Sequence, residues 1–220
     1  MDRTFFLMLI ILILVSCEES IKFEEPQPSN HVNLTRIPKQ LQGSYYSISD
    51  DTYLTINDQV IVDWTDSKYK TLIDSLTLEI DSTKIKEETD DFVNIVDGRY
   101  KLNLHLFGDS VLVHYSYRDT LFEISDRHIL RRFKGHYFLN YKKSETNWKV
   151  RRLTLNKKEL SFSKVRIPAD ITTLQQVTGM QEIKSDSGKV VGYKLKPTRK
   201  ELKKLMKHNF SETKTYRKAK

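Results

Sequence analysis

Apolar and polar residues alternate along much of the chain, which predicts short β-strands. In residues 100–117 (YKLNLHLFGDSVLVHYSY), every second residue is apolar on either side of Gly108-Asp109. Strand side chains alternate between the two faces of a sheet, so a hairpin that turns at this dipeptide has matching apolar faces. Glycine supplies the positive φ that a type II′ turn needs at its first central position. The predicted register places Leu104 opposite Val113.

The same alternation predicts three further hairpins. They are residues 53–64 with a turn near Asn57-Asp58, residues 152–165 with a turn near Asn156-Lys157, and residues 181–195 with Ser187-Gly188 in the turn. Successive hairpins of this kind are typical of all-β domains. We therefore expect a mainly β fold, either an antiparallel β-barrel or a sandwich.

One pattern occurs twice. LQGSYY (41–46) precedes LTINDQVIV (54–62), and FKGHYF (133–138) precedes LTLNKKELSF (153–162). Both copies read apolar-x-Gly-x-Tyr-aromatic and then Leu-Thr-aliphatic-Asn. Short patterns also recur by chance in strand-rich sequences, and the tyrosines could simply be core or rim residues. The duplication hypothesis predicts two similar β-units. Its repeats are residues 41–125 and 133–196.

Helix signals are confined to two places. Asp170 can cap a short helix near 170–178. A second helix begins after Thr198, which forms a capping box with Glu201. Its apolar stripe consists of Leu202, Leu205, Met206 and Phe210. We expect this helix to dock on the β-rich body by that stripe, with a frayed, solvated tail after it.

The N-terminus has a different pattern. Residues 5–15 (FFLMLIILILV) are eleven apolar residues behind Arg3. As a helix they would cover only about half of a 30 Å hydrocarbon core. A charged start followed by a short apolar run is typical of a secretory signal peptide. Leu14-Val15-Ser16-Cys17 follows, and Cys17 is the only cysteine of the chain.

This tetrapeptide resembles the lipobox of bacterial lipoproteins. The resemblance implies that the signal peptide, residues 1–16, is removed and that the Cys17 thiol carries a lipid, because a thiolate is a readily alkylated nucleophile. The alternatives are an ordinary signal peptide with an incidental cysteine, or an uncleaved anchor. Glu18 and Glu19 resemble surface-export signals of some lipoproteins. Without that role, the inner leaflet of the outer membrane is the expected location.

Composition adds a charge asymmetry. The net charge is +8, and residues 194–220 hold eleven Lys and Arg against two acids. The basic character is therefore expected to belong to the C-terminal segment, where the lysines could contact anionic membrane head groups. Those lysines are Lys200, Lys203, Lys204 and Lys207. The lysines of this segment have no clustered aromatic residues beside them to stack on bases, and export argues against nucleic acid as a partner.

Reactive constellations are few. His105 and His114 lie diagonally on one face of the predicted hairpin, but zinc needs three or four ligands. Neither G-x-S-x-G nor H-E-x-x-H occurs in the sequence. We therefore expect no metal, no cofactor and no catalytic residue. Gly43-x-Tyr45 and Gly135-x-Tyr137 resemble the Gly-x-Trp start of lipocalins, although both carry Tyr. That resemblance implies a barrel that carries an apolar ligand.

The predicted organisation is a signal peptide (1–16), a lipidated flexible tether (17–35), a β-rich body (36–196) and a basic helix and tail (197–220). The expected function is that of a non-enzymatic, envelope-attached binding or interaction protein, whose partner would be an envelope protein. The alternatives are a lipocalin-like carrier of a lipid or other apolar ligand, and a hydrolase without a recognisable motif. An interaction protein should show an exposed apolar or charged patch, and a carrier a lined cavity of roughly several hundred Å³.

Overall fold

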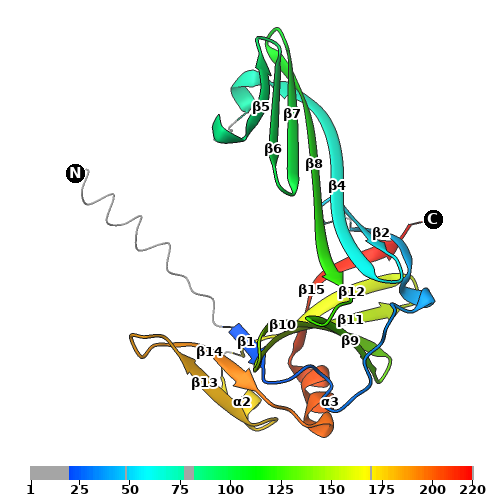
Figure 1. Ribbon diagram of the computed structural model, residues 1–220, viewed down its shortest axis with the longest axis vertical. Helices are drawn as coiled ribbons and strands as arrows, with labels where there is room; N and C mark the ends of the chain where they lie inside the picture. The colour runs from blue at the N-terminus through cyan, green and yellow to red at the C-terminus, as the bar shows by residue number, and fades with distance from the viewer. Residues whose placement is uncertain (1–19, 48, 77–81, 169, 220) are drawn as a thin grey trace. The chain divides into compact units, whose positions relative to one another are not determined.

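The structure, a computed structural model, describes residues 20–47, 49–76, 82–168 and 170–219 (Figure 1). Within these ranges the chain is mainly β. The strands are β1 (Ser20–Phe23), β2 (Gly43–Ser47), β3 (Thr52–Ile56), β4 (Val60–Leu72), β5 (Ile85–Thr89), β6 (Phe92–Asp97), β7 (Tyr100–Phe107), β8 (Ser110–Glu123), β9 (His128–Phe133), β10 (His136–Ser144), β11 (Asn147–Asn156), β12 (Glu159–Val165), β13 (Met180–Lys184), β14 (Val190–Leu195) and β15 (Phe210–Lys218). The helices are α2 (Thr172–Gln175), α3 (Arg199–His208) and the 3₁₀ turns η1 (Lys39–Leu41), η2 (Ile73–Ser75) and η3 (Ser82–Lys84).

The chain divides into two compact units. Unit 1 contains the described residues up to Asn33, together with Ile129–Leu153 and Phe162–Thr213. Unit 2 contains Leu34–His128, Thr154–Ser161 and the segment from Lys214 onward. Strands β11, β12 and β15 each contribute residues to both units.

Strand pairing confirms the predicted fold class and narrows it. The described strands pair in the order β13-β14-β1-β11-β12-β15-β2-β3-β4-β8-β7-β6-β5, with β10 beside β11 and β9. The two ends of this order do not pair, so the sheet is not closed into a barrel. Of the two predicted architectures, the sandwich is therefore compatible with the strand pairing. The lipocalin-like barrel is not, because a barrel requires its first and last strands to pair.

The core of unit 1 gathers apolar side chains from strands and both helices. Leu174 of α2 and Leu202 and Leu205 of α3 are fully buried there. The other buried members are Phe23, Phe138, Trp148, Val150, Val165 and Leu195. The short helix predicted near 170–178 is thus present as α2, and the Asp170 carboxylate accepts a hydrogen bond from the Thr172 amide at 3.0 Å. The predicted docking of α3 by its apolar stripe is seen in Leu202 and Leu205, which are buried in this core.

Residues 20–33 differ from the flexible tether expected for 17–35. Ser20–Phe23 form β1, which pairs in parallel with β14 and places Ile21 opposite Tyr193. Phe23 is 1% exposed, and the Gln27 amide donates to Asn140 Oδ1 at 2.6 Å. The proline and charged residues of the segment predicted a solvated tether, but the residues with which the segment pairs and bonds lie far away in the sequence. This part of the chain belongs to unit 1.

The C-terminal segment also differs from expectation beyond its helix. α3 begins with the predicted capping box, in which the Thr198 side chain accepts from the Glu201 amide at 3.3 Å. Instead of a frayed tail, however, Phe210–Lys218 form strand β15. Phenylalanine, threonine and tyrosine fit a pleated surface well, and Tyr216 is 1% exposed. Burial of this side chain explains why the segment is ordered.

Unit 2 contains the most regular hairpins. Leu104 lies opposite Val113, as predicted, and the turn at Gly108 has a φ of +56°. Strand β8 also pairs along the whole of β4, a ladder that runs from Val60 opposite Glu123 to Leu72 opposite Ser110. The other three predicted hairpins are β3–β4, β11–β12 and β13–β14.

The repeated pattern adopts the same register in both copies. Tyr45 lies opposite Leu54 in the β2–β3 pair, and Tyr137 lies opposite Leu153 in the β10–β11 pair. All four side chains are at most 1% exposed. Equivalent residues therefore form equivalent cross-strand pairs. This agreement supports the duplication hypothesis at the level of its hairpins, while the limits of the two repeats stay a prediction.

Candidate functional site: a basic groove in unit 1

A groove of about 660 Å³ opens on unit 1. Three stretches line it: Ile21–Phe23 in β1, Asn147–Arg151 in β11, and Lys164–Ile167 at the end of β12, together with Lys143. Strands β1 and β11 form two walls of the groove, and their pairing, in which Phe23 lies opposite Trp148, holds these walls together. Because these strands belong to the unit 1 sheet, the groove is a fixed feature of the fold.

The composition of the groove is strongly one-sided. Six of its thirteen lining residues are lysine or arginine, and none is aspartate or glutamate. The six are Lys22, Lys143, Lys149, Arg151, Lys164 and Arg166. Phe23, Trp148 and Val165, which also belong to the unit 1 core, supply an apolar part of the lining at 1%, 6% and 6% exposure. The groove therefore combines cations with a rigid apolar surface.

The cations of the groove lie close enough to affect one another. Desolvation lowers the pKa of Lys149, and the positive charges of Arg151, Lys143 and Lys164 lower it further. Within the described ranges, no carboxylate forms an ion pair with Lys149, Arg151 or Lys143. Like charges gathered without a counter-charge repel one another, which is unfavourable. A bound anion would relieve that repulsion.

The charge of the chain is divided unequally between the two units, and unit 1, which contains the basic groove, is the basic unit. From residue 20 onward, unit 1 carries 20 Lys and Arg against eight Asp and Glu, whereas unit 2 carries 16 against 18. Residues 129–153 alone hold eight basic residues and one acid. The expectation that the basic character belongs to the C-terminal segment was therefore too narrow. Opposite charges cancel along residues 17–193 of the sequence, but the fold separates them.

The structure places the lysines predicted on the C-terminal helix as well. Lys200, Lys203, Lys204 and Lys207 are all exposed on α3. The amide of Arg166, a groove residue, donates to the carbonyl of Asn209 at the end of α3 at 3.0 Å. One end of the helix thus lies beside the groove. Cys17, Glu18 and Glu19 lie outside the described residues.

The two histidines considered for metal binding lie as the hairpin register predicted. His105 is opposite Leu112, and His114 is opposite Asn103. His114 Nε2 is 2.8 Å from Asp66 Oδ1. In the part of the chain that the structure describes, no three His, Cys, Asp or Glu side chains form a group that could hold a metal ion.

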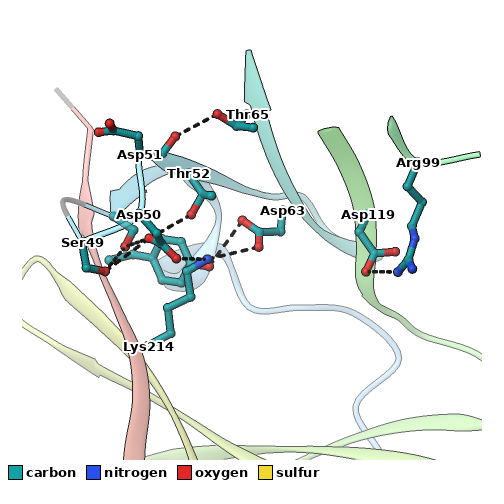
Figure 2. A network of polar contacts seen from close by, with 11 residues as sticks. Ser49, Asp50, Asp51, Thr52, Asp63, Thr65, Arg99, Asp119 and Lys214 are labelled. Carbon is teal, nitrogen blue, oxygen red and sulfur yellow. Dashed lines mark hydrogen bonds and ion pairs between the residues drawn. The ribbon is translucent and has the colours of Figure 1, made fainter. Parts of the chain in front are cut away.

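A second charged cluster lies in unit 2, around Lys214 of β15 (Figure 2). Lys214 Nζ is 2.8 Å from Asp50 Oδ2 and 3.3 Å from Asp63 Oδ2. Tyr216 Oη donates to Asp63 Oδ1 at 3.4 Å, and Ser47 Oγ donates to Asp50 Oδ1 at 2.5 Å. Figure 2 also shows the separate ion pair of Arg99 with Asp119, at 3.1 Å.

The environment of Lys214 keeps it protonated. Burial alone would lower the pKa of Lys214, but the hydrogen bond to Asp50 and the charge of Asp63 raise it above its ordinary value. Burial raises the pKa of Tyr216 to about 12. An ammonium ion held between two carboxylates is a poor nucleophile and a poor base. The cluster is best explained as the tie that fixes β15 within unit 2.

Two further observations bear on function. Neither helix in the described ranges is long and apolar enough to cross a membrane. Comparison with protein-family models, with curated proteins and with solved structures gave no match. Sequence reasoning missed the basic groove, although residues 142–152 hold five Lys and Arg against one acid.

Proposed function

We propose that this chain is a lipid-anchored, non-enzymatic binding protein of a bacterial cell envelope, and that the unit 1 groove binds a phosphate-bearing head group with a net negative charge. The observation that carries the proposal is the lining of the groove, which has six cations, no acid and an apolar surface. Lysine and arginine form strong charge-assisted hydrogen bonds with phosphate oxygens. An apolar surface next to them suits the part of an amphiphile that adjoins its head group.

The position of the lipid supports a ligand from the membrane surface. The lipobox-like Leu14-Val15-Ser16-Cys17 makes Cys17 the attachment point, and β1 begins at Ser20. Three residue steps span at most about 11 Å. A lipid on Cys17 would hold β1, one wall of the groove, within reach of the head groups. The exposed lysines of α3 would add electrostatic attraction to an anionic surface.

The apolar-ligand carrier is the weaker alternative. The volume of the groove, about 660 Å³, is in the range of small-ligand sites. A wholly apolar ligand, however, would desolvate the cations without giving them a partner, and that is costly. The charge of the lining therefore favours an anionic ligand over an uncharged one. The outer membrane is the proposed location, on its periplasmic face or, through Glu18 and Glu19, on the cell surface.

Two experiments test the two parts of this proposal separately. The anchor predicts that metabolic labelling with a fatty acid marks the chain and that Cys17→Ala abolishes the label and leaves uncleaved precursor. Normal processing of that variant would contradict it.

For the groove, Trp64→Phe leaves Trp148 as the only tryptophan of the chain. Its fluorescence should change on titration with inorganic phosphate or a short-chain phosphatidylglycerol, and not with the matching phosphatidylcholine. An equal response to phosphatidylcholine would contradict a groove that selects anionic head groups.

A further inference from the structure

Three aromatic side chains form a row across unit 2. Tyr46 of β2 lies opposite Tyr53 of β3, which in turn lies opposite Trp64 of β4. The ring centroids of Tyr46 and Tyr53 are 5.2 Å apart, and those of Tyr53 and Trp64 are 4.5 Å apart with an angle of 18° between the planes. Trp64 Nε1 donates to Thr55 Oγ1 at 3.0 Å. Stacking and this hydrogen bond together fix the orientation of the indole.

A second groove, of about 490 Å³, begins where this row ends. Trp64 lines it, whereas Tyr53 and Tyr46 do not. On the other side of Trp64 lies Arg118 of β8, its cross-strand partner. The remaining lining residues are polar except for Gly98: Thr65, Asp66, Arg99, Lys101, Ser116, Tyr117 and Thr120. The groove is thus a fixed aromatic surface with hydrogen-bonding groups next to it.

Several of these groups have no partner within the described residues. The side chains of Arg118, Lys101 and Ser116 take part in no hydrogen bond or ion pair there. Asp66 contacts His114 through Oδ1, which leaves Oδ2 as an acceptor. Donors and an acceptor therefore stand side by side, a requirement for binding groups that both donate and accept, as hydroxyls do.

The charge of this groove differs from that of the unit 1 groove. Arg99 is already paired with Asp119, and Asp66 offsets one of the two remaining cations. A ligand here needs no large negative charge. A flat aromatic surface beside mixed donors and acceptors suits a sugar ring, whose C–H face packs on the aromatic ring while its hydroxyls form hydrogen bonds.

We propose that this groove binds a neutral oligosaccharide, with one sugar ring on Trp64 and its hydroxyls bonded to Arg118, Asp66 and Ser116. The site lies wholly in unit 2 and does not depend on the proposed function of unit 1.

Calorimetric titration of the purified full chain tests this site. The probes are neutral hexasaccharides of α-linked glucose, β-linked glucose and β-linked N-acetylglucosamine. At least one should bind with a dissociation constant below about 1 mM, and Arg118→Ala should weaken it at least about tenfold. Arg127→Ala, a change at an exposed arginine of the same unit that lies outside the groove, should leave it unchanged.

A second variant separates loss of binding from loss of folding. Trp64→Ala should abolish the titration heat. Arg118→Ala, a change at an exposed side chain, should keep the melting temperature of the native chain, so that its weaker binding does not come from unfolding. In Trp148→Phe, where Trp64 is the only tryptophan, the bound sugar should change the fluorescence. Failure of all three hexasaccharides to bind, or equal binding by the Arg118→Ala and native chains, would overturn the proposal.

Discussion

The side chain of Asn140 and the main chain of Gln27 form two hydrogen bonds with each other. The Gln27 amide donates to Asn140 Oδ1 at 2.6 Å, and Asn140 Nδ2 donates to the Gln27 carbonyl at 2.9 Å. Both residues are 0% exposed, and 113 residues separate them in the sequence. This pair joins the segment that follows Cys17, the proposed lipid attachment point, to strand β10, so a lipid on Cys17 would be coupled to the core of unit 1.

Replacement of Asn140 should therefore destabilise the protein strongly. Asn140→Ala leaves a buried amide and a buried carbonyl of Gln27 without these partners, each at a cost of about 1–3 kcal/mol. We expect a loss of about 3 kcal/mol in the free energy of unfolding, measured by chemical denaturation. The control is Asn94→Ala in β6, which should change it by less than about 0.5 kcal/mol. Equal stability of the two variants would contradict the proposed role of the pair.

Lys214→Met should destabilise unit 2, because Asp63 is 8% exposed and would lose its cation. We expect a cost of about 2 kcal/mol, less than for a fully buried pair, since the Lys214 side chain is 25% exposed. The exposed pair of Lys196 with Glu24 gives the control. Lys196→Met should cost less than about 0.5 kcal/mol.

The acid dependence of stability should change in the same variant. Burial alone would raise the pKa of Asp50, but hydrogen bonds from Lys214 and Ser47 lower it. A carboxylate with a lowered pKa stabilises the fold above its unfolded pKa and loses that contribution as the pH falls through its folded pKa. In Lys214→Met this loss should shrink, because Asp50 no longer accepts a hydrogen bond from an ammonium ion. Parallel acid denaturation curves of the native chain and the variant would refute this explanation.

Removal of one groove cation should stabilise the fold. Desolvation and three neighbouring cations lower the pKa of Lys149, so its charge opposes folding. Lys149→Gln should raise the free energy of unfolding by about 0.5 kcal/mol at low ionic strength, and added salt should shrink the gain by screening. Lys39→Gln, at an exposed site in unit 2, should show no gain. A variant that gains stability but loses anion binding has the trade-off expected of a binding site.

Gly43, at the start of β2, has a φ of +129°, a conformation that side chains with a Cβ avoid. Gly43→Ala should cost about 2 kcal/mol of stability. Gly98, in the turn between β6 and β7, has a φ of +51°, which asparagine tolerates. Gly98→Asn should therefore lower the free energy of unfolding by less than about 0.5 kcal/mol. Thermal unfolding of both variants measures the two losses. A comparable loss at the two glycines would show that the backbone of β2 is not constrained.

Local patterns predicted much of the fold. The Gly108-Asp109 turn fixed the register of β7 and β8, and the capping box of Thr198 and Glu201 marked the start of α3, because both depend on residues close together in the sequence. The pairing of β1 with β14 depends on residues more than 170 positions apart. The polar composition of residues 20–33 gave no sign of it. The barrel alternative failed for the same reason, since sheet closure is a long-range property.

The candidate sites were less predictable than the elements that carry them. Lys22 of β1 is distant in sequence from Lys149 and Lys164, which lie on the β11–β12 hairpin, and only the fold gathers all three in one groove. Summing charge along the chain concealed this gathering, because the acids of residues 34–128 cancelled the cations of residues 129–153. Trp64 and Arg118 likewise meet only through the β4–β8 ladder. The sequence did point correctly to exposed lysines on α3, but not to the groove beside it.

Two variants of equal charge distinguish the unit 1 groove from the α3 lysines as the site that binds an anionic head group. One replaces Lys143, Lys149 and Arg151 with glutamine, and the other replaces Lys200, Lys203 and Lys204. The purified full chain and both variants, in a neutral detergent, are titrated with a short-chain phosphatidylglycerol. A parallel titration with inorganic phosphate shows whether the phosphate alone is sufficient.

The groove variant should bind the phosphatidylglycerol at least about fiftyfold more weakly than the native chain, and the α3 variant should bind within about threefold of it. The reverse order would show that the α3 lysines, and not the groove, bind the anionic head group. Native affinity in both variants would remove the basic groove as a binding site.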